Sequence, residues 1–104
     1  MAWLALVFAG LLEVVWAAAL KYSEGLTKLW PSLTALVTVV LSLWLLGIAM
    51  KSLPLGTAYG VWVGIGAVGT LIFGIVFLSE PATLLRLFSI LLILLGMIGL
   101  KISH

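Results

Sequence analysis

Nearly the whole chain is divided into four charge-poor runs, and this feature leaves few folds open. The runs cover residues 1–20, 29–50, 52–79 and 82–100, each near or above the roughly 20 residues that a membrane-spanning helix needs. The chain is 65% hydrophobic and 8% charged, with a mean hydropathy of +1.44, which a water-soluble domain of this size would not show. The runs lack the alternation of a transmembrane β-barrel. We therefore expect an all-α integral membrane protein.

Short polar turns separate the runs and limit what the protein can do. The segment 21–28 is a polar turn before Trp30-Pro31, and proline fits the first turn of a helix because its missing N–H would lack a partner there. The segments 51–54 and 79–81 form the other two connections. With such short loops, an extramembrane catalytic domain has no room, so we do not expect an enzyme. We predict one domain, residues 1–104, with helices at 2–20, 30–50, 56–78 and 83–101.

The residue types that bind metals and nucleic acids are scarce. The chain has no cysteine, and its one histidine is the terminal His104, so the sequence predicts no metal site and no cofactor. A net charge of +2 is too small to indicate binding to nucleic acid.

The loop charges bear on how the helices insert. An up-down-up-down path places Lys51 and Lys101 on the side of the N-terminus, and Lys21, Lys28 and Arg86 on the other side. The positive-inside rule works through a bias in Lys and Arg, and this chain has almost none. The sequence therefore predicts insertion in both orientations, the alternative being a single orientation set by other factors.

Insertion in both orientations suggests an antiparallel homodimer. Many transporters place their substrate site between inverted repeats, but residues 1–50 and 51–104 do not resemble each other. Four helices are also few to enclose a substrate cavity. An inverted second copy would supply both the repeat and the missing walls.

Glu13 is the only charged side chain between Met1 and Leu20. An ionised carboxylate near the bilayer centre costs roughly 2.5 to 3.5 kcal/mol, so an acid there is a functional candidate by default. At ~1.5 Å per residue, Glu13 lies about 18 Å into a core of roughly 30 Å. A carboxyl group can hold either a proton or a cation, and this exclusion is the minimum requirement for exchange transport. The alternative is an acid that only links helices.

Aromatic side chains fall on helix faces where they could surround Glu13. Gly10 and Trp16 share its face at i−3 and i+3, while Tyr59 and Trp62 share one face of the third helix. Ring faces attract cations, and a planar guanidinium can stack on them while donating to a carboxylate in a bidentate fork. We expect an aromatic box around Glu13, with ordinary aromatic packing as the alternative.

The second helix carries Thr34, Thr38 and Ser42 at i, i+4 and i+8. This polar stripe could orient Glu13 or bind a substrate N–H, and Ser42 is best placed by depth. The alternative is that the hydroxyl groups satisfy carbonyl groups of their own helix.

Small residues mark the third and fourth helices. Gly60 and Gly64 make a small-xxx-small contact, and Gly64-Ile65-Gly66 weakens the helix where a hinge could bend it, although close packing alone would also explain these glycines. On the fourth helix, Ser89 and Gly96 lie seven apart and predict a dimer seam.

Three motifs give the chain a close resemblance to the small multidrug resistance family. They are Glu13-Val14-Val15-Trp16-Ala17, the segment 21–25 that follows it, and the glycine-rich segment 56–70. The similarity runs from end to end. It implies four helices per subunit, antiparallel pairing, one site between the subunits, and proton-coupled export of cations.

Within this family the chain is similar to the guanidinium-exporting branch. Trp16 stands where the multidrug branch usually has a small residue, the run 64–70 resembles the guanidinium branch, and Thr38 and Val39 occur where multidrug members carry a tyrosine. Ser89 departs from the glycine common at the dimer seam of the fourth helix. The resemblance implies that Glu13 of both subunits binds substrate or protons and that the site is lined by Gly10, Glu13, Trp16, Ser42, Tyr59 and Trp62.

The leading prediction is a guanidinium/proton antiporter of the bacterial inner membrane, a homodimer that works by alternating access. One alternative is a multidrug exporter of the same fold that takes quaternary ammonium ions. A second, from another class, is a non-transporting or proton-conducting subunit of a larger membrane complex.

Overall fold

The computed structural model describes residues 1–103; His104, the lone histidine considered as a metal ligand, lies outside them. These residues form four α-helices, each long and apolar enough to cross a membrane, which confirms the expected all-α membrane architecture. Each end differs by no more than two residues from the prediction, because polar residues such as Lys21 and Tyr22 continue a helix readily. The helices are α1 (Ala2–Tyr22), α2 (Leu29–Ala49), α3 (Leu55–Phe77) and α4 (Leu84–Ser103).

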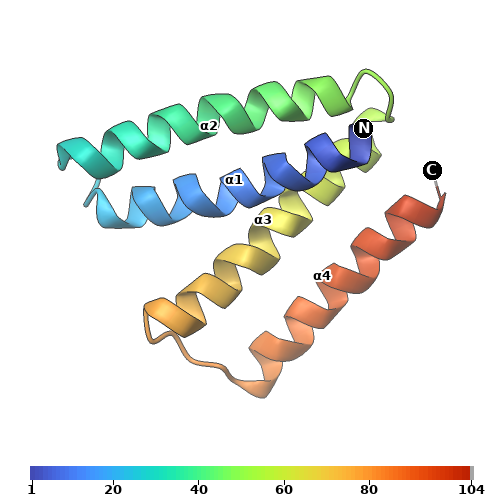
Figure 1. Cartoon of the computed structure of the whole chain (residues 1–104). Helices are drawn as coiled ribbons and strands as arrows, with labels where there is room; N and C mark the ends of the chain where they lie inside the picture. The colour runs from blue at the N-terminus through green and yellow to red at the C-terminus, as the bar shows by residue number, and fades with distance from the viewer. Residues whose placement is uncertain (104) are drawn as a thin grey trace.

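The helices follow the expected up-down-up-down path (Figure 1). α1 and α2 lie side by side and antiparallel, α3 packs mainly against α1, and the backbone of α4 approaches only α3. The N-terminus, the α2–α3 turn and the last turn of α4 lie at one end of the molecule, and the other two turns lie at the opposite end. A single chain is thus an open bundle with α4 on its flank.

The core lies where α1, α2 and α3 meet. Leu6 of α1 is fully buried, and Leu46 of α2 and Val61 of α3 are nearly so. The cluster also contains three alanines, which let the helix backbones approach closely, as is common between transmembrane helices. By contrast, Ile90 is the one buried residue of α4. The face that α4 turns away from α3 is apolar and uncovered in a single chain.

A tight turn sets the antiparallel pairing of α1 and α2. Three consecutive residues have positive φ, Glu24 (50°), Gly25 (77°) and Leu26 (67°). The buried hydroxyl group of Ser23 donates to the carbonyl oxygen of Leu20 (2.7 Å) and accepts from the N–H of Leu26 (3.0 Å). These bonds stabilise three residues in the left-handed backbone conformation. Glycine adopts this conformation readily, whereas Glu24 and Leu26 adopt it at a cost in conformational energy.

Candidate functional site

The carboxyl group of Glu13 rests on the backbone of α3. A Cβ atom placed on Gly66 would overlap Oε1 and Cδ of Glu13 and would lie 2.7 Å from its Cγ. Oε1 is buried and has no hydrogen-bond partner within residues 1–103. The acid therefore occupies a space that exists only because position 66 has no side chain, and its buried Oε1 has no hydrogen-bond partner among the described residues.

Close contacts on both sides of this position hold α1 against α3. A Cβ atom on Gly10 would lie 2.6 Å from Cβ of Ile65, and one on Gly69 would overlap Cγ2 of Val14. Gly10 therefore acts in the structure as the point where the backbone of α1 meets a side chain of α3. The approach of the two backbones keeps Glu13 between the helices instead of turned out towards lipid.

The two glycines proposed as a hinge lie on different seams of α3. Gly66 faces Glu13 of α1, whereas Cβ on Gly64 would lie 2.6 Å from Cγ and Sδ of Met97 on α4. Gly60 also faces α4, where its Cβ would lie 2.8 Å from Cδ1 of Leu100. α3 is continuous through this region, so the bend stays a prediction.

Ser42 ties three helices together. Its buried Oγ donates to the carbonyl oxygen of Ala9 on α1 (2.7 Å) and accepts from Nε1 of Trp62 on α3 (3.0 Å). The hydroxyl group thus uses its proton and one lone pair inside the protein. In this conformation Ser42 positions Trp62 and the α1 backbone, and the sequence offered no signal for the carbonyl group of Ala9 as its acceptor.

The other two members of the α2 polar stripe behave differently. The hydroxyl group of Thr34 donates to the carbonyl oxygen of Trp30 (3.0 Å), and that of Thr38 to the carbonyl oxygen of Thr34 (2.6 Å). Both bonds stay within α2, as the backbone interpretation predicts. Equal spacing in the sequence therefore did not produce equal roles.

Tyr59 and Trp62 lie together, as their spacing predicts. Their ring centroids are 5.5 Å apart with an interplanar angle of 51°. Trp62 is only 7% exposed, whereas Tyr59 is 52% exposed in the single chain. Tyr59 therefore presents an uncovered ring beside a ring held by Ser42.

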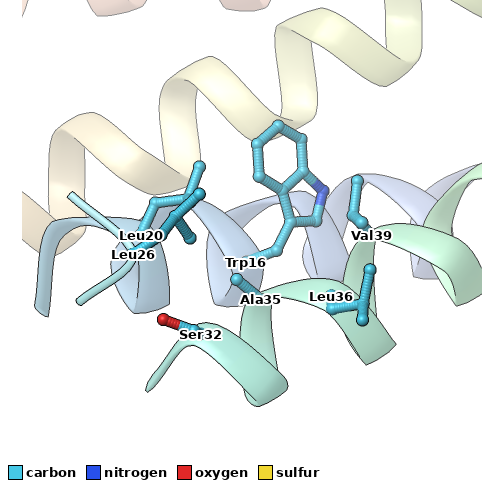
Figure 2. A pocket seen from close by; sticks show the side chains of 7 residues that line it. All are labelled: Trp16, Leu20, Leu26, Ser32, Ala35, Leu36 and Val39. Atoms are coloured by element: carbon cyan, nitrogen blue, oxygen red, sulfur yellow. The ribbon is translucent and has the colours of Figure 1, made fainter. Parts of the chain in front are cut away.

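Trp16 lines a pocket of about 220 Å³ between α1 and α2. Figure 2 shows its indole ring between Leu20 and Leu26 on one side and Val39 on the other, with Ser32 farther along the wall. Its Nε1 is buried without a hydrogen-bond partner in the described part of the chain. Within residues 1–103 no ring contact joins Trp16 to Tyr59 or Trp62, so the aromatic box is not closed by one subunit and stays a prediction for an assembly.

The two residues of the expected dimer seam are both exposed on α4. Ser89 donates its hydroxyl group to the carbonyl oxygen of Leu85 (2.8 Å), and nothing lies within 4 Å of a Cβ atom placed on Gly96. The pairing of α4 with a second copy stays a prediction. Among residues 1–103, no three His, Cys, Asp or Glu side chains cluster in a way that could hold a metal ion.

These features define a multi-pass membrane protein with an unpaired acid between its helices, an arrangement that marks substrate and ion pathways. The chain belongs to the Small Multidrug Resistance protein family, whose sequence profile matches residues 1–93. It is a multi-pass protein of the inner membrane.

Several relatives match almost the full chain. A guanidinium exporter from Yersinia pestis is 61% identical over 99% of both chains. Guanidinium exporters from Escherichia coli K12 and Proteus vulgaris are 58% and 52% identical, each over 99% of this chain and at least 98% of their own. The family assignment made from the motifs is thus confirmed, and the relatives are named as exporters.

Proposed function

We propose that this protein exports guanidinium in exchange for protons and works as an antiparallel homodimer. The observation that carries the proposal is the buried, unpartnered Oε1 of Glu13 on Gly66, deep in an apolar span. Relatives of full length, 52% to 61% identical, are named guanidinium exporters, which supports this choice of substrate. Beyond the names of these relatives, we propose that protons are the coupling ion, that two chains form the transporter, and that Glu13 binds both cations.

The chemistry of the site suits a planar cation. Guanidinium carries only donors, and an ionised carboxylate only acceptors, so the two can form paired charge-assisted hydrogen bonds. The exposed ring of Tyr59 offers a π face at the same site in the proposed assembly, where a desolvated cation gains further attraction. When Glu13 is protonated it loses the charge that holds the cation, so a proton and guanidinium compete for the same group.

The unpartnered N–H of Trp16 favours a second subunit at the site. An indole N–H only donates, and guanidinium offers it no acceptor. A carboxylate can accept from this N–H, and the Glu13 of an inverted second copy would bring one. The weak Lys and Arg bias of the loops permits that inversion.

In the proposed cycle the two cations compete for a shared pair of acids, and alternating access opens that pair to one side of the membrane at a time. Guanidinium bound from the cytoplasm would be carried across and displaced by protons from the other side. Each subunit would present Glu13 from the opposite direction, so the two end states would be equivalent by symmetry.

The test is guanidinium uptake by purified protein in liposomes under an imposed pH gradient. We expect uptake driven by the gradient, and Glu13→Gln should abolish it while the dimer stays folded. Glu24→Gln is the matched control, because Glu24 is an exposed acid paired only with Lys28 (3.4 Å). Gradient-driven uptake that persists in Glu13→Gln would overturn the proposal.

One observation favours a second candidate, export of larger apolar cations. The pocket beside Trp16 is open and almost wholly apolar in its lining. A tetraalkylammonium panel measured in the same liposomes separates the two substrates. Transport of these ions at rates above that of guanidinium would favour the multidrug function.

A further inference from the structure

A second cavity lies between α1 and α3, beside Glu13. Its volume is about 180 Å³, and Ala17 and Thr70 are among its lining residues. Ala17 follows Glu13 by four residues and Thr70 follows Gly66 by four, so both lining residues lie about one helical turn, or ~6 Å of helix rise, beyond the Glu13–Gly66 contact. It occupies the part of the α1–α3 seam between Glu13 and the end of the molecule.

Two groups of opposite charge lie at the outer end of this cavity. Lys21 belongs to the last turn of α1, and Glu80 to the α3–α4 turn, and both line the cavity. No carboxylate lies within ion-pair distance of Lys21 among the described residues. In the structure no ion pair joins Lys21 to Glu80 across this outer end, which we call the mouth of the cavity.

Glu80 is held in place by the end of α3. The N–H groups of Leu78 and Glu80 both donate to the carbonyl oxygen of Gly74, at 3.0 and 3.1 Å. A Cβ atom on Gly74 would overlap Oε1 of Glu80, so the missing side chain makes room for the acid. Nη2 of Arg86 donates to the same Oε1 at 3.0 Å. Glu80 is thus a fixed acceptor at the mouth of the cavity.

The same carboxylate has room for a second cation. An ionised carboxyl group has about four lone-pair sites, and Arg86 uses one oxygen atom of Glu80. The flexible four-carbon stem of Lys21 can move its ammonium group across the cavity without a change in the backbone.

We propose that this cavity is the water path by which protons reach Glu13, and that Lys21 and Glu80 open and close its mouth. The inference rests on the proposed exchange of protons at Glu13. In the closed state the ammonium group of Lys21 and the guanidinium group of Arg86 both bind the carboxylate of Glu80. In the open state, Glu80 binds only Arg86, as it does in the structure. An exposed ion pair between Lys21 and Glu80 would shift the equilibrium between the open and closed mouth by only about two- to fivefold. Such a weak pair can break in every transport cycle.

The path is tested with single cysteines, since the chain has none of its own. A charged, water-soluble thiol reagent should modify Thr70→Cys in liposomes. Ile72→Cys is the matched control, because Ile72 is on the same helix, is 48% exposed in the single chain and does not line the cavity. We expect Thr70→Cys to react at least tenfold faster. Equal rates would overturn the water path.

The mouth is tested in the Thr70→Cys background. Lys21→Met removes the ammonium group but keeps an apolar stem, and should raise the labelling rate about two- to fivefold because the mouth stays open. Glu80→Gln should act in the same direction. Lys28→Met is the control, because Lys28 pairs with Glu24 in the other turn, and it should leave the rate unchanged. An unchanged rate in Lys21→Met would overturn the role of the pair.

Labelling requires no transport, so it separates this inference from the proposed function. If Thr70→Cys labels as expected but the wild-type protein carries no guanidinium, the proposed function is overturned and the cavity is kept. A protein that exchanges guanidinium for protons while Thr70→Cys stays unreactive would overturn the cavity alone.

Discussion

The carboxyl group of Glu13 on α1 and the bare backbone of Gly66 on α3 occupy one contact, at which a Cβ atom on residue 66 would overlap the acid. The contact explains how an acid is kept inside an apolar bundle without a basic partner. The two glycines of the Gly64-Ile65-Gly66 segment thus contact different helices: Gly66 makes room for Glu13 on α1, and Gly64 makes room for Met97 on α4.

Gly66→Ala should displace the carboxyl group of Glu13. We expect a loss of guanidinium exchange of about tenfold or more, with a destabilisation of about 1–3 kcal/mol from overpacking. Exchange and thermal unfolding in detergent measure the two effects. Gly47→Ala is the control, because nothing lies within 4 Å of a Cβ atom there. Wild-type exchange by Gly66→Ala would mean that the contact does not position Glu13.

Ser42→Ala should leave the indole N–H of Trp62 and the carbonyl oxygen of Ala9 without partners in a buried place. The expected loss in the free energy of unfolding is about 1–3 kcal/mol. Ser32→Ala should change it by no more than about 0.5 kcal/mol, because the Ser32 hydroxyl group donates only to its own helix, at Lys28. In a double-mutant cycle, Trp62→Phe should cost less once Ser42 is Ala, and additive losses would contradict the bond.

Trp16→Gly should loosen selectivity towards bulkier cations, because the ring forms part of the wall of an apolar pocket that would then widen. The ratio of tetraalkylammonium to guanidinium transport measures the change, and we expect it to rise at least severalfold. Trp44→Gly is the control, since Trp44 lies exposed on α2 and away from that pocket. An unchanged substrate profile in Trp16→Gly would count against a selective wall.

Gly64→Val should push α4 away from α3. The added side chain would collide with Met97, and we expect a destabilisation of about 1–3 kcal/mol together with a weaker dimer. Met97→Ala should partly restore a Gly64→Val protein, since it removes the colliding atoms. Gly99→Val meets no side chain within 4 Å in the single chain and provides the comparison. Cross-linking yield and unfolding in detergent report both effects, and a stable Gly64→Val dimer would contradict the assigned contact.

The helices and several local pairings could be predicted from the sequence. The spacing of Tyr59 and Trp62 predicted a shared face, and their rings are 5.5 Å apart. The same reasoning could not predict that one ring would be buried and the other half exposed, because burial depends on which neighbours cover each side of the face. The sequence likewise grouped Thr34, Thr38 and Ser42, whereas the structure gives only Ser42 a partner on another helix.

The sequence by itself determined four membrane-spanning helices and an acid within the first, because the length of an apolar run and the presence of a charge are local properties that need no knowledge of packing. Only the tertiary structure decided that Glu13 rests on Gly66 instead of Gly64, and that Ser42 holds Trp62. Such contacts depend on the rotation of each helix about its axis and on the depth at which helices cross. Both are set by the packing of all the small side chains together, and two glycines two residues apart can therefore face different helices.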